Sequence, residues 1–208
     1  MLPAQMRSGP NGGMNRIGDA IKWTARAAAT LVMTPALLSY YLRAAVLGQP
    51  RALTASTQAI GLIPGLTGQY LRRAFLARTL AHCAPTAVIE WGTLIADPRT
   101  SIGDYAYIGP GCHIGYALIE RDVLIAPAVH IPSGGMTHGI DDPDQPLRNQ
   151  SGDRHCVRIG ENSWIGAAAV IMADVGARTI VGAGAVVTSP LPDRVVAAGV
   201  PARVIRLR

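Results

Sequence analysis

The sequence predicts a mainly β protein in which a solenoid of short parallel strands follows an N-terminal α-helical extension. A six-residue repeat runs through the C-terminal part of the 208-residue chain, whereas hydrophobic residues in the N-terminal part follow helical spacing. The composition agrees with this division. Because the chain has a single Phe, its core must be built from Ile, Val, Leu and Ala, which suit thin, stacked β layers. The length allows one domain with a small extension.

The helical extension is expected to span residues 16–84, after a polar, Gly-rich segment at residues 1–15 that we expect to be disordered. Ile21–Leu47 is typical of a helix that is broken at Pro35. The Gly- and Pro-containing stretch Gly61–Gly68 indicates a turn. An amphipathic helix is predicted after it, with apolar positions at Leu66, Tyr70, Leu76 and Leu80.

Positive charge is concentrated in this extension. Residues 1–82 hold nine basic residues and one acidic residue, which gives +8, while the remainder of the chain is −2 and the total is +6. Such a surface could meet an anionic membrane or could simply be solvated, and the sequence leaves both interpretations open. Nucleic acid is not an expected partner, because no recognised nucleic-acid motif is present.

Several features bear on where the protein works. The longest uncharged stretch, Ala27–Leu42, has 16 residues, and a spanning helix needs about 20 apolar residues, so an interfacial or buried helix is predicted. The N-terminus does not read as a signal peptide. Three cysteines at unrelated spacings indicate a reducing compartment. The expected location is therefore cytoplasmic, with peripheral contact at the inner face of the membrane as one interpretation.

The repeat defines the second region, expected at residues 85–208. An aliphatic residue opens each unit, Gly or Ala usually follows, and the fifth position is usually small. One unit makes a short strand and a corner, with the opening aliphatic residue pointing into a narrow tube. Gly at the second position either relieves backbone crowding or permits unusual dihedral angles. Each coil pairs only with its neighbours, so several must stack to be stable. Clear units are Ile102–Tyr107, Ile108–His113, Ile159–Trp164, Ile165–Val170 and Val181–Val186.

On these residues the chain from about Thr86 to Arg206 resembles the hexapeptide-repeat acyltransferases. The tail is similar to the galactoside, maltose and xenobiotic acetyltransferase branch in the stretches Ile159–Gly166, Val181–Thr188 and Val195–Arg206. The resemblance implies a left-handed parallel β-helix and acyl transfer from acetyl-CoA to a hydroxyl. The helical extension lies outside this match and is weakly similar to acyltransferases of surface-polysaccharide synthesis. The expected acceptor is thus a sugar hydroxyl, such as that of a polysaccharide precursor.

The candidate catalytic residue is His138. The repeat breaks at residues 132–157, where a Gly-, Pro- and Asp-rich segment is expected to leave the solenoid as a functional loop. Acyl transfer to a hydroxyl needs a base that titrates near neutral pH, and histidine is that residue. The resembling enzymes carry a catalytic His at this place. Asp141, Asp142 and His155 are candidates for acceptor binding, and either aspartate could instead orient His138 or only solvate the loop.

The resemblance also implies where coenzyme A binds. Backbone contacts are expected near Ala167 and Ala183, and Trp164 either stacks on the coenzyme or packs at a corner. Arg203 and Arg206 are candidates for its phosphates. The family often carries Lys where this chain has Ser189, so phosphate binding there is expected to be weaker or supplied by an arginine.

Further interpretations concern the remaining residues. His113 and His130 are expected at exposed corners or at a subunit contact, and His82 is expected to be structural. Cys156 could be a nucleophile, although nothing in the sequence suggests an activated thiolate. No metal is expected, but a zinc-dependent hydratase with three converging histidines is a competing class. An acetyltransferase for an antibiotic or amino-acid hydroxyl is another. The resemblance further implies a homotrimer with active sites between subunits.

Overall fold

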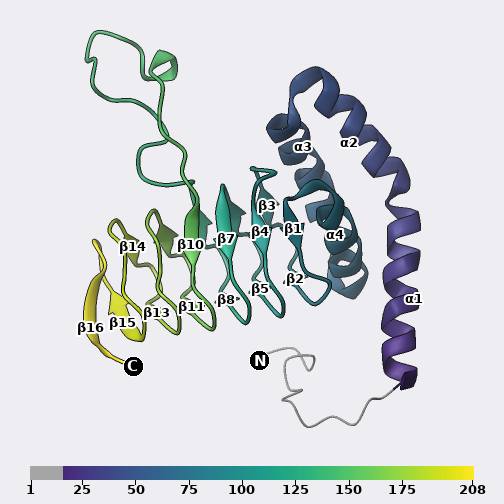
Figure 1. Ribbon diagram of the computed structural model, residues 1–208. Coiled ribbons are helices and arrows are strands. Elements are labelled where there is room, and N and C mark those ends of the chain that lie inside the picture. The colour runs from purple at the N-terminus through teal and green to yellow at the C-terminus, as the bar shows by residue number, and fades with distance from the viewer. Residues whose placement is uncertain (1–15) are drawn as a thin grey trace.

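The computed structural model describes residues 16–208, so the expectation of disorder at residues 1–15 lies outside the described residues. Four helices precede a triangular solenoid, as Figure 1 shows. They are α1 (Arg16–Val32), α2 (Thr34–Leu47), α3 (Gln49–Gly61) and α4 (Gly65–Thr79). Helices α1 and α2 meet at Met33, and Pro35 occupies the first turn of α2, as the expected break required. Helix α3 was not expected from the sequence.

Helix α4 attaches the extension to the first coil of the solenoid. The Arg72 side chain is only 3% exposed, and its Nε donates to the Ile89 carbonyl at 2.9 Å while Nη1 donates to the Ile63 carbonyl at 2.5 Å. A side chain at Gly68 would collide with Ile63 O, so this close approach requires glycine. The α3–α4 turn and the strand at Ile89 are therefore held together by one buried guanidinium.

No single helix among the described residues is long and apolar enough to cross a membrane. The pair Ala20–Val32 and Thr34–Leu47 would satisfy the length and composition together, with a bend of 48° between its members.

The solenoid consists of three sheets whose strands pair in parallel, except that β16 pairs antiparallel with β15. The first has the order β1-β4-β7-β10, the second β16-β15-β13-β11-β8-β5-β2, and the third β14-β12-β9-β6-β3. Since the first strand begins at His82, the change from helix to strand comes slightly before the expected boundary. The strands are β1 (His82–Cys83), β2 (Val88–Ile89), β3 (Leu94–Ile95), β4 (Ser101–Ile102), β5 (Tyr107–Ile108), β6 (His113–Ile114), β7 (Ala117–Ile119), β8 (Leu124–Ile125), β9 (His130–Ile131), β10 (Val157–Ile159), β11 (Trp164–Ile165), β12 (Val170–Ile171), β13 (Ile180–Val181), β14 (Val186–Val187), β15 (Val195–Ala198) and β16 (Arg203–Leu207).

The opening residues of the repeat form the core. In the second sheet Ile108 pairs with Ile89 and Ile125, and Ile165 continues the same file of buried side chains. Each of these isoleucines is at most 1% exposed. Full burial of one such side chain contributes about 1.5–3 kcal/mol before entropy is counted, so the files supply the main driving force for coiling.

Glycine at the second position of the repeat relieves crowding and does not provide unusual dihedral angles. An added Cβ there would come within 3.0 Å of the backbone of the next coil, as at Gly103, Gly109, Gly160, Gly166 and Gly176. Left-handed backbone occurs instead at the fourth position, where non-glycine residues have φ between 53 and 58°: Tyr105, Asp122, Ala128, Asn162, Ala168, Arg178 and Arg194.

Buried hydroxyl groups join successive coils at the corners. Thr93 Oγ1 donates to Gly109 O at 2.7 Å and accepts from the N–H of Cys112. Ser163 Oγ donates to Gly176 O at 2.8 Å and accepts from the N–H of Thr179. Because each hydroxyl both donates and accepts, burial leaves no unpaired polar atom at these corners.

Candidate active site

The excursion loop, residues 132–156, leaves the third sheet after β9 and re-enters the first sheet at β10 (Figure 1). Its root is hydrogen-bonded to the coil beneath, because Ser133 Oγ accepts from the N–H of Tyr116 at 2.7 Å. Its two arms then approach each other: the N–H of His155 donates to Ser133 O, and the N–H of Asp153 donates to Met136 O at 2.7 Å. We call these arms, residues 133–139 and 150–155, the neck.

A charged platform lies under the root of the loop. Arg99 donates to both carboxylate oxygens of Asp97, at 3.0 and 2.7 Å, and its guanidinium lies 4.1 Å from the centre of the Tyr116 ring. Burial acts to raise the pKa of Asp97, but the hydrogen bonds from Arg99 outweigh it and the pKa is lowered. An ion pair and a cation–π contact therefore link the two corners of the preceding coils, β3–β4 and β6–β7, at the edge from which the loop leaves.

His138 lies in the neck, and its side chain is exposed. The opposite arm packs directly against its backbone, since an added Cβ at Gly152 would collide with the carbonyl of Thr137 and the N–H of His138. Gly139 is likewise packed against Ser151. The imidazole is thus presented to solvent by a tightly paired backbone.

Of the predicted acceptor-binding residues, His155 lies in the neck, whereas Asp141 and Asp142 lie beyond it toward the loop tip; none is hydrogen-bonded to His138 within residues 16–208. Asp142 Oδ1 accepts from the N–H of Asp144, and Gln150 Nε2 donates to Asp142 O at 2.7 Å, so Asp142 stabilises the loop tip. Asp141 is exposed. The His155 ring lies against Gly134, where φ is +97° and any Cβ would collide with the imidazole.

The three sheets form a triangular prism with three edges. The predicted coenzyme contacts lie at a different edge from the root of the loop. Ala167 and Ala183 occupy successive corners between the second and third sheets, and the N–H of Gly184 donates to Ala167 O at 2.8 Å. In the described part of the chain, the N–H groups of Ala167 and Ala183 make no backbone hydrogen bond. Small side chains with free N–H groups along an exposed edge suit the amide-bearing arm of coenzyme A, so these residues fit the ligand.

Trp164 is the first residue of β11. Of its two sequence-based interpretations, the one that places it at a corner is therefore wrong. Its side chain is 51% exposed on the outer face of the second sheet, in one row with Ile180, Val196 and Arg206. Arg203 pairs with Ala198. The guanidinium groups of Arg203 and Arg206 donate to main-chain oxygens of neighbouring residues, at 3.2 and 3.1 Å.

Ser189 is exposed and follows β14, at the same edge of the prism as the loop root. It is therefore separated by the third sheet from the edge that carries Ala167 and Ala183. The structure groups the predicted coenzyme residues near the second sheet, apart from Ser189, and leaves His138 across the third sheet from them.

His113 and His130 also lie on strands, β6 and β9, instead of at corners. They pair across the third sheet with ring centroids 6.2 Å apart. Burial and then the charge of His130 lower the pKa of His113. No group of three His, Cys, Asp or Glu side chains within the described residues could hold a metal ion. His82 lies in β1 and is exposed.

The cysteine thiols are poor nucleophiles. Burial raises the pKa of Cys83 to about 12 and that of Cys112 to about 11. Burial and the nearby Asp174 carboxylate raise the pKa of Cys156. A thiol must ionise to attack a thioester, so these environments disfavour the cysteine alternative.

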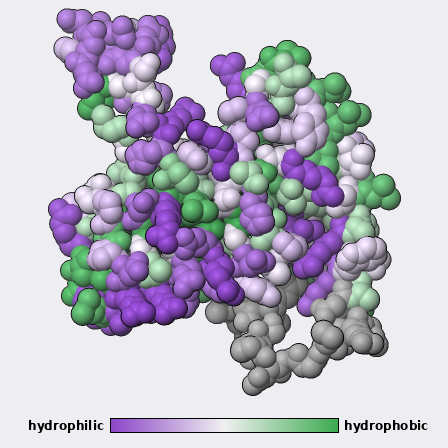
Figure 2. Space-filling model, in the orientation of Figure 1, coloured by the Kyte–Doolittle hydropathy of each residue, from purple (hydrophilic) through white to green (hydrophobic). Residues whose placement is uncertain are grey.

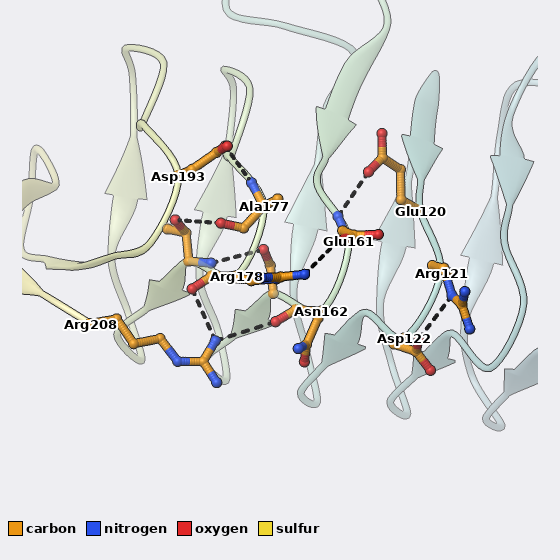
Figure 3. Close-up of polar contacts among 11 residues, drawn as sticks. Glu120, Arg121, Asp122, Glu161, Asn162, Ala177, Arg178, Asp193 and Arg208 are labelled. Carbon is orange, nitrogen blue, oxygen red and sulfur yellow. Dashed lines mark hydrogen bonds and ion pairs between the residues drawn. The ribbon is translucent and has the colours of Figure 1, made fainter. Parts of the chain in front are cut away.

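The third edge of the prism, between the first and second sheets, is occupied by a polar ladder (Figure 3). Glu120 accepts from Arg158 Nε at 2.7 Å and from the N–H of Glu161 at 2.8 Å, and Glu161 pairs with Arg178 at 3.2 Å. Arg208 Nη1 donates to the Arg178 carbonyl at 2.9 Å. Since these groups already partner each other, this edge stabilises the coils, and the other two edges remain for chemistry.

A parallel solenoid with a hexapeptide repeat and a histidine-bearing excursion agrees with the expected class, the hexapeptide-repeat acyltransferases. Searched against models of protein families, the sequence matches none. It is 34% identical to the galactoside O-acetyltransferase of Escherichia coli K12 over 169 residues, which are 68% of this chain and 80% of that protein. It is 30% identical over 122 residues, 55% of this chain and 61% of the other, to E. coli WbbJ, which is named for O-acetyl transfer in lipopolysaccharide biosynthesis.

Among solved structures, the hexapeptide-repeat acetyltransferase VCA0836 of Vibrio cholerae superposes with a TM-score of 0.66 and 20% identity, covering 78% of this chain and 94% of that chain. This likeness confirms the fold as a left-handed parallel β-helix. The chain belongs to the hexapeptide-repeat acetyltransferases, in the group of the galactoside enzyme, and is an O-acetyltransferase.

Sequence reasoning missed the residues that hold the loop: Ser133, Gly152 and the Arg99–Tyr116 contact. Glycines occur near both ends of the long break, Gly134 and Gly135 at one end and Gly152 at the other. Their presence in both arms is the signal from which a paired neck could have been inferred.

Proposed function

We propose that His138 is the general base in acetyl transfer from acetyl-CoA to an acceptor hydroxyl. The observation that carries the proposal is the exposed imidazole held by the paired neck of the loop. The imidazole takes the hydroxyl proton while the oxygen attacks the thioester carbonyl carbon. The C–S bond then breaks, and coenzyme A leaves as the thiol after taking up a proton. Backbone N–H groups stabilise the oxyanion that forms between these steps.

The test is His138→Ala, measured as release of coenzyme A at saturating acetyl-CoA. A general base typically contributes 10²–10⁴-fold, so a loss of about 10² or more in kcat is expected. Because the side chain is exposed, the melting temperature should not change. His82→Ala is the matched control, since His82 is also exposed but lies at the far end of the solenoid. Near-normal turnover of His138→Ala would exclude this role.

The coenzyme is proposed to bind along the edge formed by Ala167 and Ala183, with Arg203 and Arg206 near its phosphates and Trp164 beside it. Free N–H groups and small side chains along the edge support this placement. Ala183→Trp should raise KM for acetyl-CoA without unfolding an exposed corner. If Arg203 binds the 3′-phosphate, Arg203→Gln should weaken the binding of acetyl-CoA much more than the binding of 3′-dephospho-acetyl-CoA. Equal effects on both donors would exclude that contact.

We propose that active sites form between subunits of a homotrimer. Within one chain the coenzyme edge and the His138 loop lie at opposite edges of the third sheet, so a second copy is needed to bring a donor to the base. At acetyl-CoA concentrations well below the raised KM of Ala183→Trp, mixed oligomers of His138→Ala and Ala183→Trp chains should therefore recover activity that both variants lack under those conditions. Failure to recover it in verified mixed oligomers would indicate a site contained within one chain.

The acceptor is proposed to be a sugar hydroxyl, such as one on a polysaccharide precursor, bound beside Asp141, Asp142 and His155. The names of the two E. coli relatives and the hydrophilic loop tip in Figure 2 support this class. A screen of sugars, amino acids and hydroxyl-bearing antibiotics with radiolabelled acetyl-CoA tests it. Transfer to serine or to an antibiotic, with none to sugars, would replace the sugar assignment.

We further propose that the helical extension contacts an anionic membrane from the cytoplasmic side. Large apolar side chains are exposed on α1 and α2, and the segment of residues 1–82 carries +8. The full-length protein should sediment with vesicles that contain equimolar phosphatidylcholine and phosphatidylglycerol, and not with phosphatidylcholine alone. No sedimentation with either vesicle would refute the contact.

A further inference from the structure

Where α1 packs on α4, the charges of Arg26 from α1 and Arg78 from α4 both act on the Arg73 side chain of α4. The Arg73 side chain is only 9% exposed, yet its Nε has no hydrogen-bond partner among the described residues. Burial lowers the pKa of Arg73 first, and the neighbouring charges of Arg26 and Arg78 lower it further. A desolvated guanidinium beside two like charges is unfavourable unless an anion joins them.

No ion pair found in the described part of the chain supplies that anion. All four ion pairs found within residues 16–208 lie in the solenoid, and none involves these three arginines. Arg78 donates only to the carbonyl of Ala74 in its own helix. Four helices with eight basic residues and one acidic residue, Asp19, leave the cluster with a strong excess of positive charge.

An exposed apolar surface adjoins the cluster. Trp23 is 70% exposed and stands one helical turn before Arg26, so the two side chains are neighbours on α1. The surface continues along the outer side of α1 and α2, where Val46 is 82% exposed, and hydrophobic residues cover α2 in Figure 2. We call this the outer face; its large side chains are Trp23, Leu31, Leu38, Leu42 and Val46.

We propose that the α1–α4 junction is a binding site for the phosphate headgroup of an anionic lipid, with the accessible Arg26 and Arg78 as its ligands, the buried charge of Arg73 beneath them, and the outer face in the acyl region. The proposal rests on the membrane contact proposed above and gives it a specific lipid site. A free phosphate would need no adjoining apolar surface. A second copy of the chain would bring two strongly basic extensions together, whereas an anionic bilayer complements both the charge and the apolar face.

The test uses the full-length double variant Arg26→Gln/Arg78→Gln, because both side chains are accessible and Arg73 is not. Vesicle binding should fall about 25-fold, since each basic residue near an anionic surface contributes about fivefold. The matched control is Arg121→Gln/Arg194→Gln, which removes two exposed arginines of the solenoid. If the double variant binds like the control, the site is wrong even though membrane contact stands.

A second arm separates lipid from free phosphate. Leu31→Ser/Leu42→Ser leaves the arginines intact and should abolish vesicle binding. Inorganic pyrophosphate should not displace the wild-type protein from vesicles at physiological ionic strength. Displacement by pyrophosphate beyond an ionic-strength control, together with unchanged vesicle binding of the leucine variant, would assign the site to a soluble anion. Acetyl transfer to a soluble acceptor should be the same in all these variants, so failure of the lipid site cannot be confused with loss of catalysis.

Discussion

Gly152→Ala should impair catalysis by moving His138 without unfolding the protein. The new Cβ would lie 2.2 Å from the carbonyl of Thr137 and 2.4 Å from the backbone N of His138, closer than the 3.0 Å below which Cβ contacts essentially never occur. The two arms of the neck must therefore separate by roughly 0.6–0.8 Å. Misplacement of a reacting group by about 1 Å can cost about 10²-fold in rate. We therefore expect kcat to fall about 10–10²-fold, with little change in KM for acetyl-CoA because the coenzyme edge is remote.

The control is Gly135→Ala, which lies in the arm that carries His138 but has no atom within 4 Å of an added Cβ and has no left-handed φ. Steady-state release of coenzyme A and thermal unfolding should be measured for both variants at one protein concentration. Both should melt like the wild type, because the neck lies outside the solenoid. If Gly152→Ala and Gly135→Ala have equal kcat values while the separate variant His138→Ala is inactive, positioning of His138 by the neck is refuted.

Three further predictions concern the solenoid. Gly109→Ala should lower the free energy of unfolding by about 1–3 kcal/mol through overpacking, because its Cβ would lie 2.8 Å from the backbone of the next coil. Gly111→Ala has open space around its Cβ but a φ of +68°, so it should lower that free energy by about 1 kcal/mol. Urea unfolding measures both. Folding lowers the pKa of His113 below its ordinary value of 6.5, so as the pH falls below 6.5 the unfolded chain takes up the proton before the folded chain and stability should fall. His113→Asn should therefore make the melting temperature depend less on pH in scans between pH 7 and 5. At pH 8, Cys156 should react slowly with iodoacetamide while Cys83 stays unmodified until the protein unfolds, as peptide mass analysis would show; fast labelling of Cys83 would contradict its burial.

The β-helix could be predicted because its repeat is local. Each opening aliphatic residue determines one buried position, and pairing with the next coil follows from the period alone, as for Ile108 and Ile125. The side-chain direction of the sixth position was harder to assign. His113 and His130 were expected at corners, and a corner was one of two interpretations for Trp164, but each begins a two-residue strand and faces outward beside the buried residue. Six residues divide into strand and corner in more than one way, and only coil-to-coil pairing selects one.

Helix α3 was missed because its signals are weak and its stabilising contacts are tertiary. Gln49–Gly61 contains Ser and Thr at several positions and has no clear apolar stripe. It is held by packing on the first coil, where Thr57 Oγ1 donates to Ile95 O at 3.3 Å. Propensity does not anticipate such support.

The position of His138 in the loop followed from the break in the repeat, but its setting did not. The packing of Gly152 against His138 joins residues from opposite arms of the loop, and Tyr116 belongs to the preceding coil. No periodicity relates these positions, so the neck could be recognised only in three dimensions.

The two ends of the solenoid determine how far the coil can extend. A stack of parallel strands exposes an unpaired edge at each end, which can recruit another chain and grow into a fibre. Helices α3 and α4 cover the first coil, whereas at the other end β16 turns back antiparallel to β15 and places Arg203, Arg206 and Arg208 at or beside the outermost strand. Charge repulsion between such strands discourages two copies from pairing through this end of the solenoid, so a strongly self-pairing repeat carries its own protection against fibre growth.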